Sequence, residues 1–114
     1  KTTTKEFLAA LLGEKYRVWK NEGSYNSQVT FPLTILNRGD EEVMVLEMGI
    51  SLPGEMERLI DVAAPDLAIL TKVALVHGAF FPGGLEQITE EKKKIFSHSR
   101  TKEAIVPSEI SMEE

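Results

Sequence analysis

The sequence predicts an α/β domain with a mostly parallel sheet, and two observations carry that prediction. Segments typical of strands alternate with segments typical of helices along the whole chain of 114 residues. The clearest strand, Glu42–Gly49, contains four consecutive apolar residues, Val43–Leu46, as in strands that are buried on both faces. Strands that alternate with helices are usually joined by helical crossovers, which make neighbouring strands parallel.

Three further elements are predicted before that strand. Thr2–Leu12 should be helical, because its apolar residues recur at helical spacing and threonine hydroxyls at its start suit free N–H groups. Gly13 should end this helix, and Tyr16–Trp19 should form a short strand. Residues 29–36 fit either a strand or a helix, although Pro32 favours the helix because proline suits a first helical turn. The apolar stripe of the first helix consists of Phe7, Leu8, Leu11 and Leu12.

Four elements and a loop are predicted after that strand. Pro53–Ala63 should form a helix with its apolar side chains on one side, and Asp66–Val73 a second buried strand. Residues 77–84 are rich in glycine and proline, so we expect a loop there. Leu85–Phe96 should form a helix and Glu103–Pro107 a last strand. The apolar side of the Pro53–Ala63 helix consists of Met56, Leu59, Ile60 and Ala63.

The composition excludes several classes of function. A net charge of −5 argues against nucleic acid as a partner. The chain has no cysteine, which excludes disulfides and thiolate metal sites and is compatible with a reducing cytosol. No apolar run approaches the roughly 20 residues of a membrane helix, and no signal peptide is visible. We therefore expect no membrane partner.

Two candidate residues lie near the carboxyl ends of predicted strands, where α/β sheets bind ligands. Glu47 ends an otherwise apolar strand, and a carboxylate buried there needs a cation such as Mg²⁺ or hydrogen-bond donors. His77 lies in the loop after the next buried strand. Each residue also has a plainer interpretation. The strand could simply reach the surface at Glu47, and a loop histidine could be structural or solvated.

The first three residues, Lys1, Thr2 and Thr3, are a further candidate site. A P-loop ends in Gly-Lys-[Ser/Thr] at the start of a helix. Its lysine reaches the β- and γ-phosphates, its hydroxyl binds Mg²⁺, and the helix dipole favours the anion. The glycines of such a motif would precede Lys1. A lysine before a threonine N-cap is also a common structural arrangement, so both interpretations stay open.

Helical geometry distinguishes Lys92 from the lysines that follow it. At 100° per residue, Lys92 falls inside the apolar arc of its helix, whereas Lys94 points roughly the opposite way, towards solvent. The side chain of Lys92 could extend to water along this arc. Alternatively it is desolvated, which favours a neutral amine, and neutral lysine amines react with CO₂ to form a carbamate, a carboxylate-like metal ligand. The arc consists of Leu85, Ile88, Ile95 and Phe96.

Four segments carry a resemblance to a known family. They are "KTTTKEF" at the N-terminus, "GSYNSQVTFPLTIL" at residues 23–36, "VLEMGISLPGEMERL" at residues 45–59 and "LVHGAFFPGGLEQITEEKKKIF" at residues 75–96. In this order they resemble the P-loop exit, the asparagine-rich segment, the Glu-Met-Gly…Pro-Gly-Glu segment and the histidine loop of the Mur ligases, cytoplasmic enzymes that build the peptidoglycan stem peptide. The resemblance covers nearly the whole chain. It implies a P-loop-type three-layer fold, with residues 1–114 forming part of the central ATP-binding domain.

The resemblance also implies a role for each candidate near the nucleotide. Lys1 would hold the β- and γ-phosphates of ATP. Thr2 would bind Mg²⁺ beside them, with Thr3 lining the same site, and Glu47 would bind this first Mg²⁺ between ATP and substrate.

The second half of the implied site consists of His77, Lys92 and Asn26. His77 would bind a second Mg²⁺. Lys92 matches the lysine that is carbamylated in this family and would support the same ion. Asn26 matches an asparagine of the substrate-binding loop.

The implied reaction is ATP-dependent amide bond formation that adds D-Ala-D-Ala to UDP-MurNAc-tripeptide through an acyl phosphate. The Pro53-Gly54-Glu55 segment favours this activity over that of a sister Mur ligase or a folylpolyglutamate-synthase-like ligase. The family takes its UDP-sugar site from an N-terminal domain and its amine-substrate site from a C-terminal domain, and neither matches residues 1–114. We therefore expect further chain before Lys1 and after Glu114, no catalysis by this segment alone, and a cytoplasmic, monomeric ligase.

Several positions depart from the family pattern. Ser24 and Ser27 stand where asparagines are expected, and Thr30 stands where glycine is expected. The pair Thr71-Lys72 replaces Thr-Asn or Asn-Asn, and Gly78-Ala79 replaces Leu-Glu. These departures keep open a third interpretation, a non-catalytic homologue that retains the fold.

Overall fold

The computed structural model describes residues 1–22, 27, 29–73 and 80–110. The chain divides into two compact units, Lys1–Gly49 and Ile50–Glu114. Each unit contains helices and a pair of parallel strands. The prediction of an α/β fold with parallel strands is therefore confirmed.

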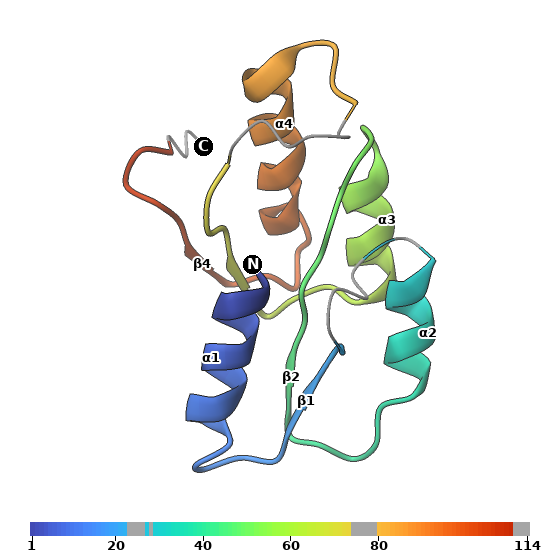
Figure 1. Cartoon of the computed structure of the whole chain (residues 1–114), viewed down its shortest axis with the longest axis vertical. Helices are drawn as coiled ribbons and strands as arrows, with labels where there is room; N and C mark the ends of the chain where they lie inside the picture. The colour runs from blue at the N-terminus through green and yellow to red at the C-terminus, as the bar shows by residue number, and fades with distance from the viewer. Residues whose placement is uncertain (23–26, 28, 74–79, 111–114) are drawn as a thin grey trace. The chain divides into compact units, whose positions relative to one another are not determined.

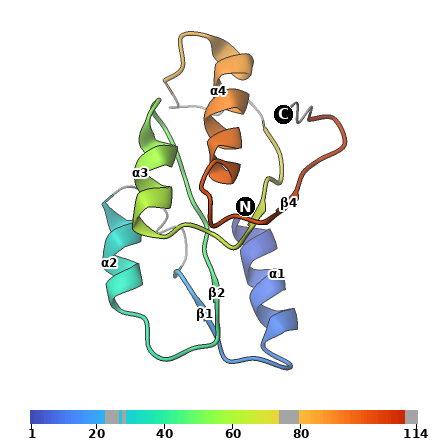
Figure 2. The same cartoon turned by 180° about the vertical axis from the view of Figure 1, so that it is seen from behind.

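The first unit combines two helices and two strands. In chain order these are α1 (Thr2–Leu12), β1 (Val18–Lys20), α2 (Thr30–Leu36) and β2 (Val43–Val45). β1 and β2 pair in parallel, with Val18 opposite Val43. Both views show α1 and α2 on opposite sides of this strand pair (Figure 1, Figure 2). The connection between the parallel strands therefore passes through α2, as a crossover helix should.

The predicted bounds of α1 are confirmed, but its buried side is not the one that the apolar stripe indicates. Gly13 ends the helix, with its N–H donating to the carbonyl of Ala9 at 2.9 Å. Phe7 and Leu11 are exposed, and the one buried residue of this helix is Lys5. A charged side chain therefore points from α1 towards the chain beyond the ends of β1 and β2.

Residues 29–36 form the helix that Pro32 favours, and the strand alternative is wrong. Pro32 is the third residue of α2, where the missing N–H costs no helical hydrogen bond. Phe31 and Ile35, four residues apart on one face, are buried. The β2 ladder is shorter than predicted, and Met44 is exposed, so burial on both faces of this strand is not seen in the described residues.

The second unit repeats the helix and strand alternation. It contains α3 (Glu55–Val62), β3 (Leu67–Ile69), α4 (Gly84–Lys93), the short 3₁₀ helix η1 (Lys94–Phe96) and β4 (Glu103–Ile105). β3 and β4 are parallel, with Ala68 opposite Ala104. Flanking backbone hydrogen bonds extend the ladder, because Lys102 N–H donates to Asp66 and Leu70 N–H donates to Ile105.

The core of the second unit lies on the predicted apolar side of α3. Met56, Leu59 and Ile60 are buried, together with Ile88 of α4. Gly54 precedes α3 with φ +88°, a left-handed conformation that costs glycine little and other residues about 1–2 kcal/mol. The Pro-Gly-Glu segment thus sets the start of α3.

The predicted helix over residues 85–96 changes character at its end. Its last three residues tighten into η1, and η1 packs against α3. No helix within residues 1–22, 27, 29–73 and 80–110 is long and apolar enough to cross a membrane.

Candidate functional site

The N-terminus of α1 is the first part of the candidate site. The helix begins at Thr2, as predicted, with Thr2 and Thr3 in its first turn, but Lys1 and not a threonine is the N-cap residue; all three are exposed. No side chain caps this helix among the described residues. The first-turn N–H groups have no partner within the helix, and together with the helix dipole they favour an anion such as phosphate.

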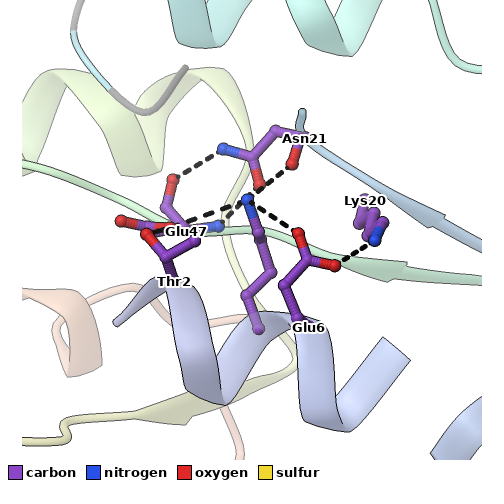
Figure 3. Close-up of polar contacts among 6 residues, drawn as sticks. Thr2, Glu6, Lys20, Asn21 and Glu47 are labelled. Atoms are coloured by element: carbon purple, nitrogen blue, oxygen red, sulfur yellow. Dashed lines mark hydrogen bonds and ion pairs between the residues drawn. The ribbon is translucent and has the colours of Figure 1, made fainter. Parts of the chain in front are cut away.

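Glu47 is brought directly to this helix terminus. The Thr2 hydroxyl donates to Glu47 Oε1 at 2.8 Å, although the two residues are 45 positions apart (Figure 3). Glu47 retains only 6% of its accessible surface, so the interpretation in which the strand reaches the surface at this residue is wrong. The structure therefore joins two of the predicted site residues in one unit.

Lys5 supplies positive charge to this contact and was not predicted from the sequence. Its ammonium lies 3.7 Å from Glu47 Oε1 and donates to the backbone carbonyl of Asn21 at 2.7 Å. A buried ammonium near a buried carboxylate offsets part of the cost of desolvating both. One signal was available, because Lys5 follows Thr2 by three residues and so shares its side of the helix.

Asn21 is the second residue that sequence reasoning missed. Its side chain accepts from Glu47 N–H at 3.0 Å and donates to Glu47 C=O at 3.1 Å. It directly follows the last ladder residue of β1, Lys20. Its polarity in a loop-like sequence gave no hint that it is completely buried.

A second ion pair lies beside Lys5. Glu6 accepts from Lys20, and its carboxylate also lies 3.8 Å from Lys5 (Figure 3). The hydrogen bond from Lys20 holds the pKa of Glu6 below its usual value, and the same bond raises the pKa of Lys20. Glu6 and Lys20 are partly exposed, so this pair contributes little to stability.

The Thr2–Glu47 pair has the spacing and chemistry of two magnesium ligands. Neighbouring ligands of an octahedral Mg²⁺ at about 2.1 Å are about 3 Å apart, close to the observed separation. Both groups supply the hard oxygen atoms that Mg²⁺ prefers. Among the residues that the structure describes, no cluster of three or more His, Cys, Asp or Glu side chains could hold a metal.

The predicted second metal site is only partly covered by the structure. His77 and Asn26 lie outside the described residues. Lys92 lies in the last turn of α4 and is partly buried. Nothing described joins these three residues, so their roles stay predictions.

Lys94, which was predicted to point to solvent, is partly exposed and also pairs with two acids. It lies 2.7 Å from Glu91 and 2.9 Å from Glu57 of α3, within the tightened turn η1. Hydrogen bonds to Glu91 and then to Glu57 raise the pKa of Lys94 above its usual value. Glu91 lies three residues before Lys94, at a neighbouring position on the helix surface, and the Lys94 side chain keeps 36% of its surface exposed, so this lysine is both partly solvated and paired.

Glu91 is the buried acid of the second unit. Its Oε1 accepts from the N–H groups of Gly54, at 2.8 Å, and Met56, at 3.3 Å. Glu91 thereby supplies a carboxylate to the start of α3, where the helix dipole favours it. A signal existed in the sequence, because Glu91 lies three residues after the buried Ile88.

Two of the departures from the family pattern bond to each other. Ser27 N–H donates to the Thr30 hydroxyl at 3.2 Å, and the two hydroxyl oxygens are 3.0 Å apart. Thr30 N–H in turn contacts the Ser27 hydroxyl at 3.4 Å. This reciprocal arrangement leads into α2 and resembles a capping box. Ser24, Gly78 and Ala79 lie outside the described residues.

Known proteins show similarity in both sequence and structure. The chain is 42% identical over 96 residues to the UDP-N-acetylmuramoyl-tripeptide–D-alanyl-D-alanine ligase of Borreliella burgdorferi, a match that covers 83% of this chain and 20% of that protein. The ligase of the same name from Bacillus subtilis is 41% identical over 98 residues, covering 85% of this chain and 21% of that protein. This chain thus spans about a fifth of the length of these curated relatives.

The structural matches agree with the sequence matches. The crystal structure of MurF ligase from Thermotoga maritima in complex with ADP superposes with a TM-score of 0.85 at 40% identity, covering 95% of this chain and 26% of that one. A MurF structure from Acinetobacter baumannii also gives 0.85, at 29% identity, over 95% of this chain and 24% of that one. The family profile of the Mur ligase middle domain matches residues 1–112. Because that match spans nearly the whole chain, the chain belongs to the Mur ligase family, in which it corresponds to the middle domain.

Proposed function

We propose that this chain is the nucleotide-binding part of an ATP-dependent ligase that adds D-Ala-D-Ala to UDP-MurNAc-tripeptide. Curated relatives carry the corresponding ligase name, and a MurF structure of similar fold contains ADP. The observation that carries the proposal is the contact between the Thr2 hydroxyl and Glu47. It joins a P-loop-type hydroxyl to a buried carboxylate from near a strand end, as a site for a metal-bound nucleotide requires.

The phosphates bind at the N-terminus of α1 in this proposal. The N–H groups of its first turn point towards the anion, and Lys1 neutralises charge on the β- and γ-phosphates. Thr3 lines the same turn. The exposure of Lys1, Thr2 and Thr3 leaves this terminus accessible to a nucleotide in the first unit.

Thr2 and Glu47 would hold the first Mg²⁺. The bound ion would neutralise charge between the triphosphate and the incoming carboxylate of the substrate. The protein supplies the geometry, because Glu47 is buried and its backbone is fixed by Asn21. The Thr2 hydroxyl can donate its proton to Glu47 while its lone pairs stay available to a cation.

The proposed reaction forms an amide in two steps. The terminal carboxylate of UDP-MurNAc-tripeptide attacks the γ-phosphorus, and the bond from that phosphorus to the β,γ-bridging oxygen breaks. ADP is released, and the tripeptide carboxylate has become an acyl phosphate. The amine of D-Ala-D-Ala then attacks the acyl carbon, loses a proton and expels inorganic phosphate. Both carboxylate and triphosphate are anions, so positive charge from Lys1 lowers the barrier to their approach.

A second cation would use the residues of the later segments. His77 would bind this second Mg²⁺, Lys92 would support it as a carbamate, and Asn26 would contact substrate. The matching positions in the motif support these roles. The partial burial of Lys92 in α4 is compatible with a less solvated amine.

The complete ligase would contain two more domains. An N-terminal domain would bind the UDP-sugar and a C-terminal domain would bind D-Ala-D-Ala. The small share of the relatives that this chain spans supports such an arrangement. We further propose that the ligase is cytoplasmic, since its UDP-linked and ATP substrates belong to that compartment. We also propose that it is a monomer.

Phosphate release by the complete ligase tests the proposed function. ATP and UDP-MurNAc-tripeptide are supplied with or without D-Ala-D-Ala, and inorganic phosphate is measured. We expect sustained release only when all three are present. Release that does not depend on the dipeptide would refute the specific activity, and an absence of release with every amine substrate would favour a non-catalytic homologue.

The role of Lys92 is tested by comparison with its neighbour. Lys92→Ala should lose most activity, and added bicarbonate should not restore it, because no amine remains to be carbamylated. Lys93→Ala is the matched control, since the described ion pair of Lys93 is with Glu90, whose side chain is 66% exposed. Full activity of Lys92→Ala would exclude the carbamate role.

A further inference from the structure

Asn21 holds both backbone polar groups of Glu47 with a single side chain. Oδ1 accepts from Glu47 N–H at 3.0 Å and Nδ2 donates to Glu47 C=O at 3.1 Å. In the reverse orientation, Nδ2 would face the N–H of Glu47 and Oδ1 would face its C=O, which would place donor against donor and acceptor against acceptor. The bonding pattern therefore fixes the amide orientation. Asn21 is completely buried, so water does not compete for these bonds.

This pair of bonds continues the strand pairing beyond its last backbone rung. The β1–β2 ladder ends where Lys20 lies opposite Val45, two residues before Glu47. From there the side chain of Asn21, rather than a peptide group of β1, pairs with the second strand. Glu47 is thus tied to β1 at the point where its carboxylate meets Thr2.

Asn21 is itself anchored to the helix that carries Thr2. Lys5 Nζ donates to the backbone carbonyl of Asn21 at 2.7 Å and lies 3.7 Å from the Glu47 carboxylate. Figure 3 shows Asn21, Glu47 and Thr2 as one connected group. The backbone of Glu47 is therefore linked to α1 through Asn21 and Lys5, while its carboxylate contacts Thr2 and Lys5 of α1 directly.

We propose that Asn21 is a positioning residue, which fixes Glu47 so that its carboxylate and the Thr2 hydroxyl bind one Mg²⁺ together. The inference rests on the proposed function, because it assumes a metal-bound nucleotide at α1. Mg²⁺ demands near-ideal octahedral geometry, so small displacements of one ligand weaken binding strongly. Asn21 does not touch the ion or the nucleotide in this role.

Binding of ADP with and without Mg²⁺ tests the inference. Isothermal titration calorimetry of the complete ligase gives the Kd of ADP in excess Mg²⁺ and in EDTA, and their ratio measures the contribution of the ion. Asn21→Ala should reduce this ratio by roughly 10-fold or more, as is typical when a group that orients a metal ligand is removed. The Kd in EDTA should stay within about threefold, because Lys1 and the helix terminus are retained.

Two further variants separate positioning from general damage. Asn37→Ala removes an exposed asparagine from the end of α2 and should leave both affinities unchanged. Asn21→Ser retains one short polar group and, should the alanine variant fail to fold, is tested in its place, with the same selective loss expected. Circular dichroism establishes that each variant is folded.

Each outcome bears on one of the two proposals. A selective loss of the Mg²⁺ contribution in the Asn21 variants supports the inference. An unchanged ratio, or equal loss of affinity with and without the ion, overturns the inference and leaves the proposed function standing. If the unsubstituted ligase fails to bind ADP under either condition, the proposed function itself is refuted.

Discussion

Glu47 and Glu91 are both buried carboxylates, one in each unit, but they are held by different kinds of donor. Glu91 accepts from two backbone N–H groups at the start of α3, with Lys94 at 2.7 Å. Glu47 accepts from the Thr2 hydroxyl, with the Lys5 ammonium at 3.7 Å. The exposed fractions are similar, 4% for Glu91 and 6% for Glu47, so burial alone does not distinguish them.

The donors decide what each carboxylate can do. The N–H groups that bind Glu91 cannot turn away without unwinding the first turn of α3, so that acid serves the fold. The Thr2 hydroxyl can rotate, and it can donate to Glu47 while also binding a cation. A buried acid near a strand end is therefore a stronger functional candidate when its donors are side chains at an accessible helix terminus.

Removing the charge of Glu47 should give the largest effect on function. Glu47→Gln in the complete ligase should lower kcat/KM for ATP-dependent phosphate release by about 100-fold or more, equivalent to about 2.7 kcal/mol, because the proposed metal ligand is lost. Glu57→Gln, at an exposed acid that pairs with Lys94, should change it by less than about threefold. If Glu47→Gln and Glu57→Gln had comparable activity, Glu47 would have no special role in function.

Removing Glu91 should give the largest effect on stability. Glu91→Ala should lower the free energy of unfolding by about 2–4 kcal/mol, measured by urea denaturation, because two N–H groups and Lys94 lose their buried acceptor. Glu91→Gln should cost less, since an amide oxygen can still accept from Gly54. The exposed neighbour provides the control, and Glu90→Ala should cost under about 0.5 kcal/mol. Equal costs at positions 90 and 91 would contradict a capping role.

Substitution of Gly54, whose N–H donates to Glu91, should have an intermediate effect on stability. Gly54→Ala should destabilise the chain by about 1–2 kcal/mol, because φ is +88° while no other atom lies within 4 Å of the added Cβ. Strain of the backbone, and not a clash, is thus the expected cause. Thermal unfolding of this variant should show a lowered midpoint, and a D-alanine at the same position, introduced by chemical synthesis, should restore it.

Exposed ion pairs should behave alike in the two units and give the smallest effect. Hydrogen bonds from Lys20 and Arg100 lower the pKa values of Glu6 and Asp66, respectively. The contribution of each pair is therefore present above the usual pKa of its acid and is lost as the pH falls through the lowered value. Carboxyl NMR titrations should show both shifts, and Lys20→Met should return Glu6 towards its usual value. A large loss of stability in that variant would contradict the weak role assigned to exposed pairs.

Sequence patterns predicted the residues whose role follows from local position. Thr2 and Glu47 were identified because one begins a helix and the other follows an apolar strand run, and the structure brings these two residues into contact. Lys5 and Asn21 were not identified, because their importance arises only when α1 packs beside the ends of two strands. Their local sequence resembles an ordinary helix surface and an ordinary loop.

The same limit applies to predictions for the lysines near the end of α4. Helical geometry placed Lys92 on the inward side of the helix, and it is partly buried. It did not foresee that Lys94 also pairs with Glu57, because that contact depends on how η1 packs against α3. Periodicity predicts the face of a helix, but not which charged groups of a neighbouring helix meet that face.

The 45-residue separation between Thr2 and Glu47 has a consequence for synthesis of the protein. A ribosome adds about 5–20 residues per second, so Glu47 is polymerised roughly 2–9 seconds after Thr2. During that interval the N-terminus of α1 lacks the carboxylate of Glu47. The Thr2–Glu47 contact, and with it the proposed magnesium site, is therefore completed only after β2 has paired with β1.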